Sequence, residues 1–300
     1  MNKLFVEWAK DSFLGQLIYL LWVFVRIFIS RKSFNDFFSS VEFVFSRDRI
    51  SLFKTIYVNL RSFPFKTAVK MPIVVYCNVE IQSLYGTMEI QGCEVVPLMI
   101  QLGCYQRYRS KGSTRINNKG KICFHGEGKI LKGAEITVFK DATLSLGNSF
   151  FVGENAIIMA AESIIIGKYC TISFDSIICD SDFHYMININ DRTIRRRMRP
   201  IVIGDYNWIA NNVTIKKGVK TPDHITVAGS FAVLSKDYTK EVNSFSILAG
   251  NPAVVIACGF SRVWKDEKKR IKMLNEYFKC HAELTKYELG EEEITDEYSY

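Results

Sequence analysis

Aliphatic residues recur at every sixth position along most of this chain. The pattern includes Leu146, Val152 and Ile158, then Ile166, Ile172 and Ile178, then Ile203, Ile209 and Ile215, and finally Thr221, Val227 and Val233. Small residues follow several of them, namely Gly147, Gly153, Gly167, Gly204, Ala210 and Ala228. Neither the helical period of 3.6 nor the strand period of 2 produces this spacing. The pattern predicts a β-solenoid, because each flat face turns one aliphatic side chain inward and each corner favours a small residue.

The extent of this pattern sets the expected domain boundaries. Shorter stretches of the same pattern occur earlier, where Ile116 and Ile122, and then Ile130 and Ile136, are six positions apart. We therefore expect a mainly β chain whose solenoid spans residues 70–260. The apolar and aromatic composition of residues 1–69 predicts an N-terminal helical subdomain, and residues 261–300 predict a C-terminal helix followed by an acidic tail.

The most apolar segment covers residues 13–29. Its longest uncharged run, residues 12–25, has 14 residues, so as a helix it would reach about 21 Å, whereas a bilayer core needs about 30 Å. Two interpretations remain open. The segment packs on the rest of the fold or on a sister subunit, or it makes a peripheral membrane contact helped by Arg26, Arg31 and Lys32.

Charge and cysteine content narrow the functional classes. Residues 281–300 hold seven acids and one lysine, which leaves 38 bases and 24 acids in the first 280 residues. Such a basic body suggests an anionic partner such as a phosphate, an anionic sugar or a membrane surface, whereas no motif typical of nucleic-acid binding is present. The eight cysteines contain no CxxC pair and no short Cys/His metal spacing, so we expect reduced thiols, a cytoplasmic protein and no metal site.

Four segments carry a resemblance to a known family. They are Pro200–Ile215, Ala228–Ser230, Ser235–Asp237 and Ile247–Ala253. These segments resemble the hexapeptide-repeat O-acetyltransferases, and the similarity covers roughly residues 115–260. The resemblance implies a left-handed parallel β-helix, assembly as a homotrimer, and acetyl-CoA as the co-substrate.

The six-residue period is interrupted over residues 179–200, where we expect an extruded catalytic loop. Acyl transfer to a hydroxyl needs a base, and an imidazole suits this role. The resemblance implies that His184 is that base. Asp182 and Asp180 are the nearest carboxylates that would orient it, although a backbone carbonyl or another coil would also serve. The alternative is a solvated loop histidine.

The resemblance also implies a binding site for the co-substrate. Its contacts correspond to Asn211, Ala228, Ser235 and Lys236, with Trp208 lining the acyl end; simple packing at a corner is the alternative for Trp208. Two departures stand out. Ala210 replaces the usual Gly, and Val254 and Ala257 stand where a basic residue usually contacts phosphate, so Arg262, Lys265 or Lys268 would have to supply that charge.

Five arginines lie beside His184, at positions 192, 195, 196, 197 and 199. They form either a solvated loop or a clamp for an anionic acceptor, since guanidinium groups pair bidentately with carboxylate and phosphate.

The leading functional hypothesis is an acetyl-CoA-dependent O-acetyltransferase that acts on a surface-glycan sugar or its precursor, in the cytoplasm or at the inner face of the membrane. Three alternatives remain: an N-acetyltransferase of an amino sugar, a serine acetyltransferase, and a non-catalytic solenoid scaffold in glycan assembly. The γ-class carbonic anhydrases are disfavoured, because they need closely spaced zinc-binding histidines and the four histidines here include no such pair.

Overall fold

The computed structural model describes residues 49–105, 112–264 and 266–290. They belong to two compact units, one that ends at Gly259 and one that begins at Phe260. The apolar segment 13–29 lies outside the described residues. Among those residues, no helix is long and apolar enough to cross a membrane.

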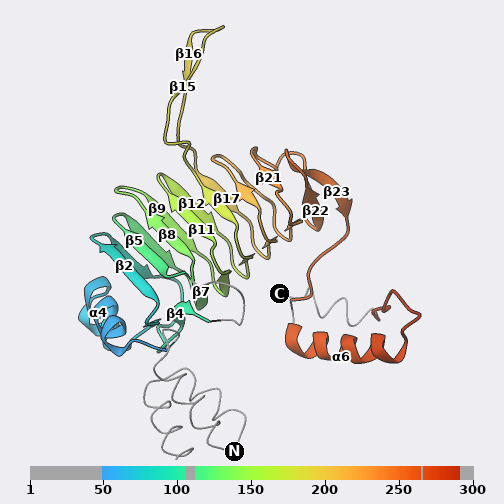
Figure 1. The fold of residues 1–300 in the computed structure, drawn as a ribbon, viewed down its shortest axis with the longest axis horizontal. Helices are drawn as coiled ribbons and strands as arrows, with labels where there is room; N and C mark the ends of the chain where they lie inside the picture. Colours follow the sequence, from blue (N-terminus) through green and yellow to red (C-terminus); the bar gives the residue numbers. More distant parts are fainter. Residues whose placement is uncertain (1–48, 106–111, 265, 291–300) are drawn as a thin grey trace, which may run out of the picture. The chain divides into compact units, whose positions relative to one another are not determined.

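The first unit is a solenoid built from three parallel sheets (Figure 1). The nine-stranded sheet contains, in order, β1 (Ile73–Val75), β4 (Ile100–Cys104), β7 (Gly128–Leu131), β10 (Phe150–Val152), β13 (Thr171–Ile172), β18 (Trp208–Ile209), β20 (Thr226–Val227), β22 (Ser246–Ala249) and β23 (Val254–Cys258). The seven-stranded sheet contains β2 (Val79–Leu84), β5 (Thr114–Asn118), β8 (Glu135–Val138), β11 (Ile157–Ala160), β14 (Ile177–Cys179), β19 (Thr214–Ile215) and β21 (Val233–Leu234). The five-stranded sheet contains β3 (Thr87–Ile90), β6 (Lys121–Phe124), β9 (Thr143–Leu146), β12 (Ser163–Ile166) and β17 (Ile201–Ile203).

Each of the first five coils passes through the nine-stranded, the seven-stranded and then the five-stranded sheet, whereas the chain runs from β19 to β20 and from β21 to β22 without a strand in the five-stranded sheet. We call the three connections of a coil the first corner (nine to seven), the second corner (seven to five) and the third corner (five to nine). All pairs within these sheets are parallel except the last, β22 with β23. The predicted left-handed parallel β-helix is confirmed.

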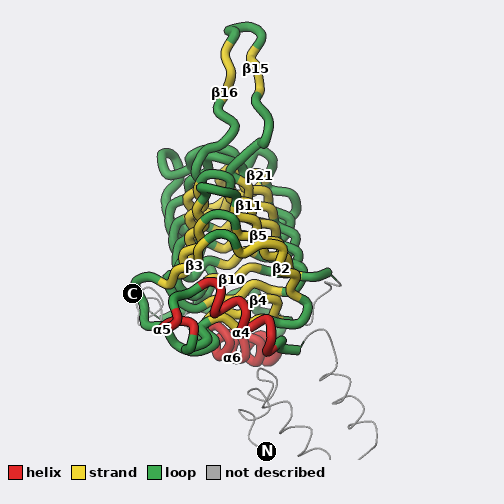
Figure 2. The backbone as a smooth tube through the Cα atoms, turned by 90° about the vertical axis from the view of Figure 1, so that its left-hand side faces the viewer, coloured by secondary structure: helices red, strands yellow, loops and turns green. Residues whose placement is uncertain are grey.

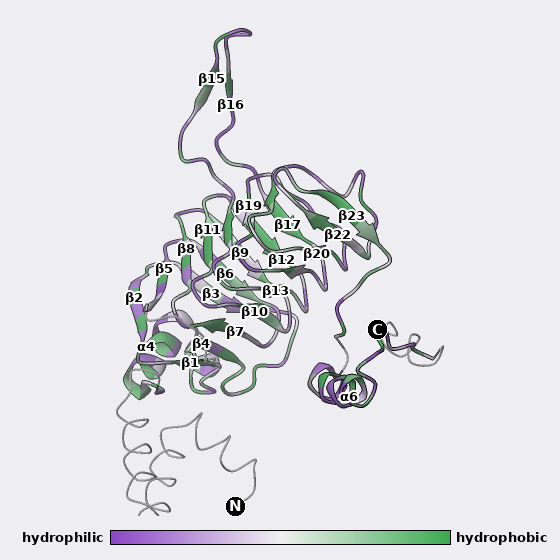
Figure 3. Ribbon diagram, turned by 45° about the vertical axis from the view of Figure 1, so that its right-hand side comes forward, coloured by the Kyte–Doolittle hydropathy of each residue, from purple (hydrophilic) through white to green (hydrophobic). Residues whose placement is uncertain are grey.

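The inward side chains follow the predicted period of six. Ile158 on β11 pairs in register with Ile136 on β8 and with Ile178 on β14, and all three side chains are buried. Burial of an aliphatic side chain of this size contributes about 1.5–3 kcal/mol. In Figure 3 the strands carry most of the hydrophobic colour and the corners are mostly hydrophilic. The coils are therefore held together by stacked aliphatic columns.

One inward position differs from the prediction. Leu234 points into the core in register with Ile215, whereas Val233 is only half-buried. The preceding corner is one residue longer than its counterpart on the coil before, because Val227 and Leu234 are seven positions apart whereas Ile209 and Ile215 are six apart. Ser230 and Phe231 in this corner have positive φ angles of 68° and 71°. This extra residue shifts the buried position of the strand by one.

The small residues at the corners are required by the close approach of neighbouring coils. A Cβ atom at Gly147 would lie 2.4 Å from the backbone of Gly167 on the next coil. Both residues belong to the third corner, where the six-residue pattern predicted a small side chain.

The first coil is capped by two helices, α4 (Leu52–Ser62) and α5 (Phe65–Ala68). The hydroxyl of Ser51 accepts a hydrogen bond from the backbone N–H of Lys54 and so caps α4. Buried Asn59 donates to the carbonyl of Ile73 at 2.6 Å and accepts from its N–H at 3.1 Å. These bonds join α4 to β1, so the described end of the predicted N-terminal subdomain lies in the same compact unit as the coils.

The second unit contains α6 (Glu267–Cys280), the helix expected near the C-terminus. Within it, the guanidinium of Arg262 contacts the carboxylate of Glu267 at 2.5 Å and lies 4.8 Å from the ring centroid of Trp264.

A ladder of aromatic rings follows the third corner. Tyr169, Tyr206, His224 and Phe245 stack on successive coils with ring centroids 4.6–4.9 Å apart. All four backbones have positive φ angles, which aim the side chains along the same edge. Burial in this ladder lowers the pKa of the His224 imidazole from its ordinary value, while the carboxylates of Asp223 and Asp205 partly oppose the shift.

We predict that this histidine makes folding stability depend on pH. Since its pKa is lower in the folded chain, the unfolded chain binds the proton more readily and stability falls as the pH drops below the unfolded value, near 6.5. His224→Phe keeps a flat ring in the ladder and removes the proton site. Scanning calorimetry at about pH 7.5 and about pH 5.5 should show a smaller acid-induced fall in Tm for the variant than for the wild type. An equal fall in both proteins would contradict this role.

Candidate active site

The expected catalytic loop leaves the solenoid at the second corner, between β14 and β17. It forms an antiparallel hairpin of β15 (Met186–Asn188) and β16 (Thr193–Arg195) that projects from the coils (Figure 2). A bridge between Ser181 and Met198 closes its base. The loop therefore leaves the solenoid and returns to it at the same corner.

Asp180 anchors the first limb of the hairpin. Its side chain is fully buried, and its carboxylate accepts the backbone N–H groups of Ala161, Glu162 and Ser163 at 2.7–2.8 Å. Hydrogen bonds to a charged group typically contribute about 1.5–3 kcal/mol each. This carboxylate holds the turn of the preceding coil, so it is engaged in structure rather than in orienting a histidine.

His184 lies just beyond this anchor, on the exposed first limb. Its side chain makes no hydrogen bond or ion pair with the described residues, and the residue is exposed. The preceding Phe183 has a φ angle of 58° and packs against Phe139, with ring centroids 5.6 Å apart. That contact fixes the backbone from which the imidazole projects.

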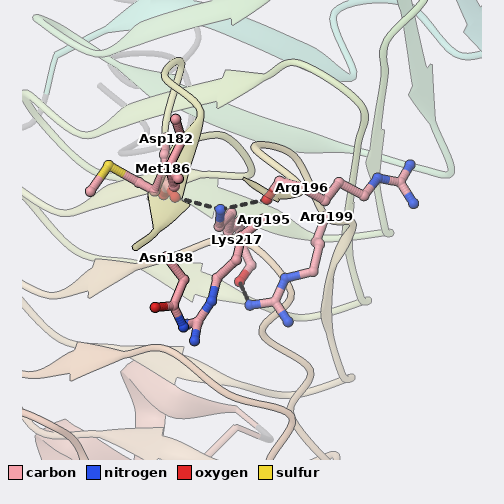
Figure 4. Close-up of a pocket in the computed structure, with 8 residues that line it drawn as sticks. Asp182, Met186, Asn188, Arg195, Arg196, Arg199 and Lys217 are labelled. Atoms are coloured by element: carbon pink, nitrogen blue, oxygen red, sulfur yellow. Dashed lines mark hydrogen bonds and ion pairs between the residues drawn. The ribbon is translucent and has the colours of Figure 1, made fainter. Parts of the chain in front are cut away.

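Asp182, the predicted orienting carboxylate, pairs with another residue in this chain. It forms an ion pair with the ammonium of Lys217, which also donates to the carbonyl of Arg196 at 2.8 Å (Figure 4). Lys217 follows β19 on the second corner of the next coil and thereby ties both limbs of the hairpin to the solenoid.

A cavity of about 730 Å³ opens at the base of the hairpin. It is lined by Asp182, Met186, Ile187, Asn188, Arg195, Arg196, Arg199 and Lys217. Four of these side chains carry a positive charge and one a negative charge, so the cavity has a cationic lining (Figure 4). A lining of this kind favours anions.

The five arginines of this segment do not act as one cluster. Arg196 pairs with Glu162 at 2.6 Å, and Arg199 donates to the carbonyl of Lys217 at 3.4 Å. The guanidinium of Arg197 lies 5.3 Å from the ring centroid of Tyr185, outside the cavity lining. Arg195 lines the cavity, and its positive charge, after the hydrogen bond from the Thr193 hydroxyl, helps to hold the pKa of the Asp191 carboxyl below its ordinary value.

Three residues expected to contact the co-substrate lie at the first corner. Trp208 is on β18, Asn211 follows that strand, and Ala228 follows β20 on the next coil. The indole Nε1 of Trp208 donates to the hydroxyl of Ser173 at 3.2 Å, which fixes the ring of this half-buried side chain. A Cβ at Gly229 would lie 2.9 Å from the amide oxygen of Asn211, so this corner leaves little room for side chains.

The other two expected contacts, Ser235 and Lys236, lie at the second corner, where they follow β21 and are exposed. Lys236 forms an ion pair with Glu241, and its ammonium lies 5.5 Å from the ring centroid of Tyr238. The hydrogen bond to Glu241 raises the pKa of Lys236 above its ordinary value. Lys236 is therefore a cation, and to bind a phosphate of the co-substrate its ammonium would have to release the carboxylate of Glu241.

The predicted residues thus form two groups on one chain. His184 and Asp182 share the second corner with Ser235 and Lys236, whereas the first-corner group occupies a different edge of the solenoid. Sequence reasoning missed Lys217 and the buried role of Asp180. The position of Lys217 two residues after the inward Ile215 was a usable signal, because it places the lysine one coil from the extruded loop.

No protein-family model matches the chain. It is 27% identical over 174 residues to the polysialic acid O-acetyltransferase of Escherichia coli O1:K1 / APEC, covering 57% of this chain and 51% of that protein. It is 32% identical over 118 residues to the putative colanic acid biosynthesis acetyltransferase WcaF of Escherichia coli strain K12, covering 38% and 57%. Among solved structures, the polySia-specific acetyltransferase NeuO matches with a TM-score of 0.41 and 20% identity, over 71% of this chain and 94% of that one.

The curated relatives are acetyltransferases by name, and the resemblance to the hexapeptide-repeat acetyltransferases is confirmed. The chain spans about half the length of the curated relatives that it matches, 51% and 57%.

Proposed function

We propose that this protein is an acyltransferase that moves acetyl from acetyl-CoA to a hydroxyl of a surface-glycan sugar or its precursor. The observation that carries the proposal is the extruded loop, in which exposed His184 stands between Asp182 and Met186, two residues that line a cationic cavity, on a solenoid whose curated relatives are named as acetyltransferases. A cytoplasmic location, where acetyl-CoA is made, belongs to the same proposal.

The chemistry assigned to His184 is general-base catalysis. Acetyl-CoA supplies an acetyl group activated as a thioester. The imidazole accepts the proton of the acceptor hydroxyl while the hydroxyl oxygen bonds to the acetyl carbon, the carbon–sulfur bond breaks, and the proton then passes from the imidazole to the departing thiolate. Ser235 and Lys236 offer a hydroxyl and a cation on an exposed edge, which suits an amide-rich, phosphorylated ligand.

The separation of the two groups of site residues supports a homotrimer. One chain places His184 at the second corner and Trp208 at the first corner. Side-by-side packing of three subunits would bring the second corner of one chain to the first corner of its neighbour and complete the site. The hairpin fits such packing, because its apolar side chains are open to solvent in the single chain, including Ile189 at 86% exposure.

An anionic acceptor is supported by the lining of the cavity. Arg195 lines it with a guanidinium whose charge also acts on the exposed carboxylate of Asp191, and Arg199 and Lys217 add positive charge around it. Carboxylate- or phosphate-bearing sugars would pair with such groups.

His184→Ala should lower kcat by about 10²–10⁴-fold, because the base is lost, while Tm stays close to the wild-type value, since the side chain is exposed. Activity of the wild type should fall at acidic pH, where imidazolium accepts no proton. The measurement is thiol release from acetyl-CoA against a panel of glycans and nucleotide sugars, together with Tm. A destabilised variant with wild-type turnover would make His184 a packing residue.

Mixed assemblies should reveal the shared site. His184→Ala and Trp208→Ala should each be inactive alone, but random co-assembly of the two chains leaves about one quarter of the intersubunit sites with both native residues. We expect acetyl transfer to return to about that fraction, in particles of three times the chain mass by light scattering. No recovery in verified mixed trimers would place each complete site within one chain.

Arg195→Gln should raise the KM for an anionic acceptor about ten-fold and leave the KM for acetyl-CoA unchanged, and the effect should shrink at high salt. Arg192→Gln is the matched control, since it removes the same charge from the same hairpin outside the cavity lining. Equal effects of Arg195→Gln on neutral and anionic acceptors would indicate a role in folding the loop.

A further inference from the structure

The outward side of the helical cap is apolar, which is the reverse of an ordinary surface helix. The inward side of α4 carries Thr55, Val58 and Asn59, all buried against the first coil. The large apolar side chains point the other way: Leu52, Phe53, Ile56, Tyr57 and Leu60 from α4, and Phe65 and Val69 at α5. We call these seven residues the α4–α5 face.

The α4–α5 face is strongly exposed. The side chain of Phe53 is 81% accessible and that of Phe65 is 76% accessible. Val96 and Leu98 extend it with further exposed apolar side chains, in a loop held to the cap by a hydrogen bond from the N–H of Leu98 to the carbonyl of Met71. A contiguous apolar patch of this kind marks a binding surface.

The charged residues around the α4–α5 face indicate what kind of partner it binds. Residues 49–79 contain five basic residues and no acidic one. The ammonium of Lys54 donates to carbonyls of the first coil, at Cys77 and Val79, and serves the fold. Arg61, Lys66 and Lys70 are exposed beside the apolar side chains. Aromatic and aliphatic side chains bordered by cations match the interface of an anionic bilayer.

We propose that the α4–α5 face docks on a membrane surface rich in anionic phospholipid. Phe53 and Phe65 enter the boundary between headgroups and acyl chains, while Arg61, Lys66 and Lys70 contact the headgroup phosphates. Positive charge beside the apolar side chains favours an anionic lipid surface over another protein segment, which would bury the apolar face without needing cations at its border. The loop with Val96 and Leu98 also carries one exposed acid, Glu94. The surface is independent of the proposed acyl transfer, and each has its own readout.

The experiment measures binding of the full-length protein to vesicles by co-sedimentation. Phosphatidylcholine vesicles are compared with vesicles that also contain phosphatidylglycerol, at low and high salt. Phe53→Ser tests the apolar contact, and Lys66→Glu with Lys70→Glu tests the charge. We expect each variant to lower partitioning onto the anionic vesicles about ten-fold and to leave acetyl transfer to a soluble acceptor unchanged.

Two matched controls stand elsewhere on the solenoid. Ile256→Ser removes an apolar side chain of similar kind, 60% exposed, on β23 at the opposite end of the nine-stranded sheet. Lys119→Glu with Lys140→Glu makes the same charge change at exposed positions on the coils. Both controls should bind the anionic vesicles as the wild type does.

Three results would overturn the proposal. Wild-type partitioning of both cap variants would show that these residues do not touch lipid. A lowered Tm of Phe53→Ser with unchanged partitioning would show that another part of the chain covers the face. A change in particle mass without a change in partitioning would assign the face to a second copy. Loss of acetyl transfer with normal vesicle binding would instead count against the proposed function alone.

Discussion

The stacking of one aliphatic side chain on its equivalent in the next coil is the constraint on which the rest of this molecule depends. Ile136, Ile158 and Ile178 form such a column, and their strands pair in parallel without a shift. Because the column fixes the rotation of each coil, it also fixes where every corner lies. Residues far apart in the sequence are thereby brought to one edge, as Lys217 is brought to Asp182.

This constraint also explains how the solenoid tolerates a long extruded loop. The chain leaves after β14 and returns at β17, whose Ile203 pairs in register with Ile166 on the preceding coil. The insertion therefore leaves the register of the inward side chains unchanged from one coil to the next. Asp180 satisfies the N–H groups of the preceding turn at the point of departure, so the loop can carry exposed, reactive side chains while its base stays rigid.

The same geometry separates tasks along the edges of the solenoid. The second corner gathers the histidine loop and positive charge, the first corner gathers the half-buried Trp208 and small residues, and the third corner is filled by stacked rings. A triangular solenoid keeps such groups apart within one chain.

The sequence by itself determined the period, the solenoid class of fold and the extruded segment, because the inward positions and their interruption are periodic features of the chain. His184 became the candidate base through the resemblance to the hexapeptide-repeat O-acetyltransferases. The sequence placed the buried residue of β21 at Val233 rather than Leu234, since the one additional residue in the preceding corner leaves no periodic signal. Only the tertiary structure decided that Asp182 pairs with Lys217 and that Asp180 is a buried anchor. Those contacts join residues on different coils. The spacing of residues along the sequence does not say which side chains of neighbouring coils lie next to each other, because that depends on how the coils stack.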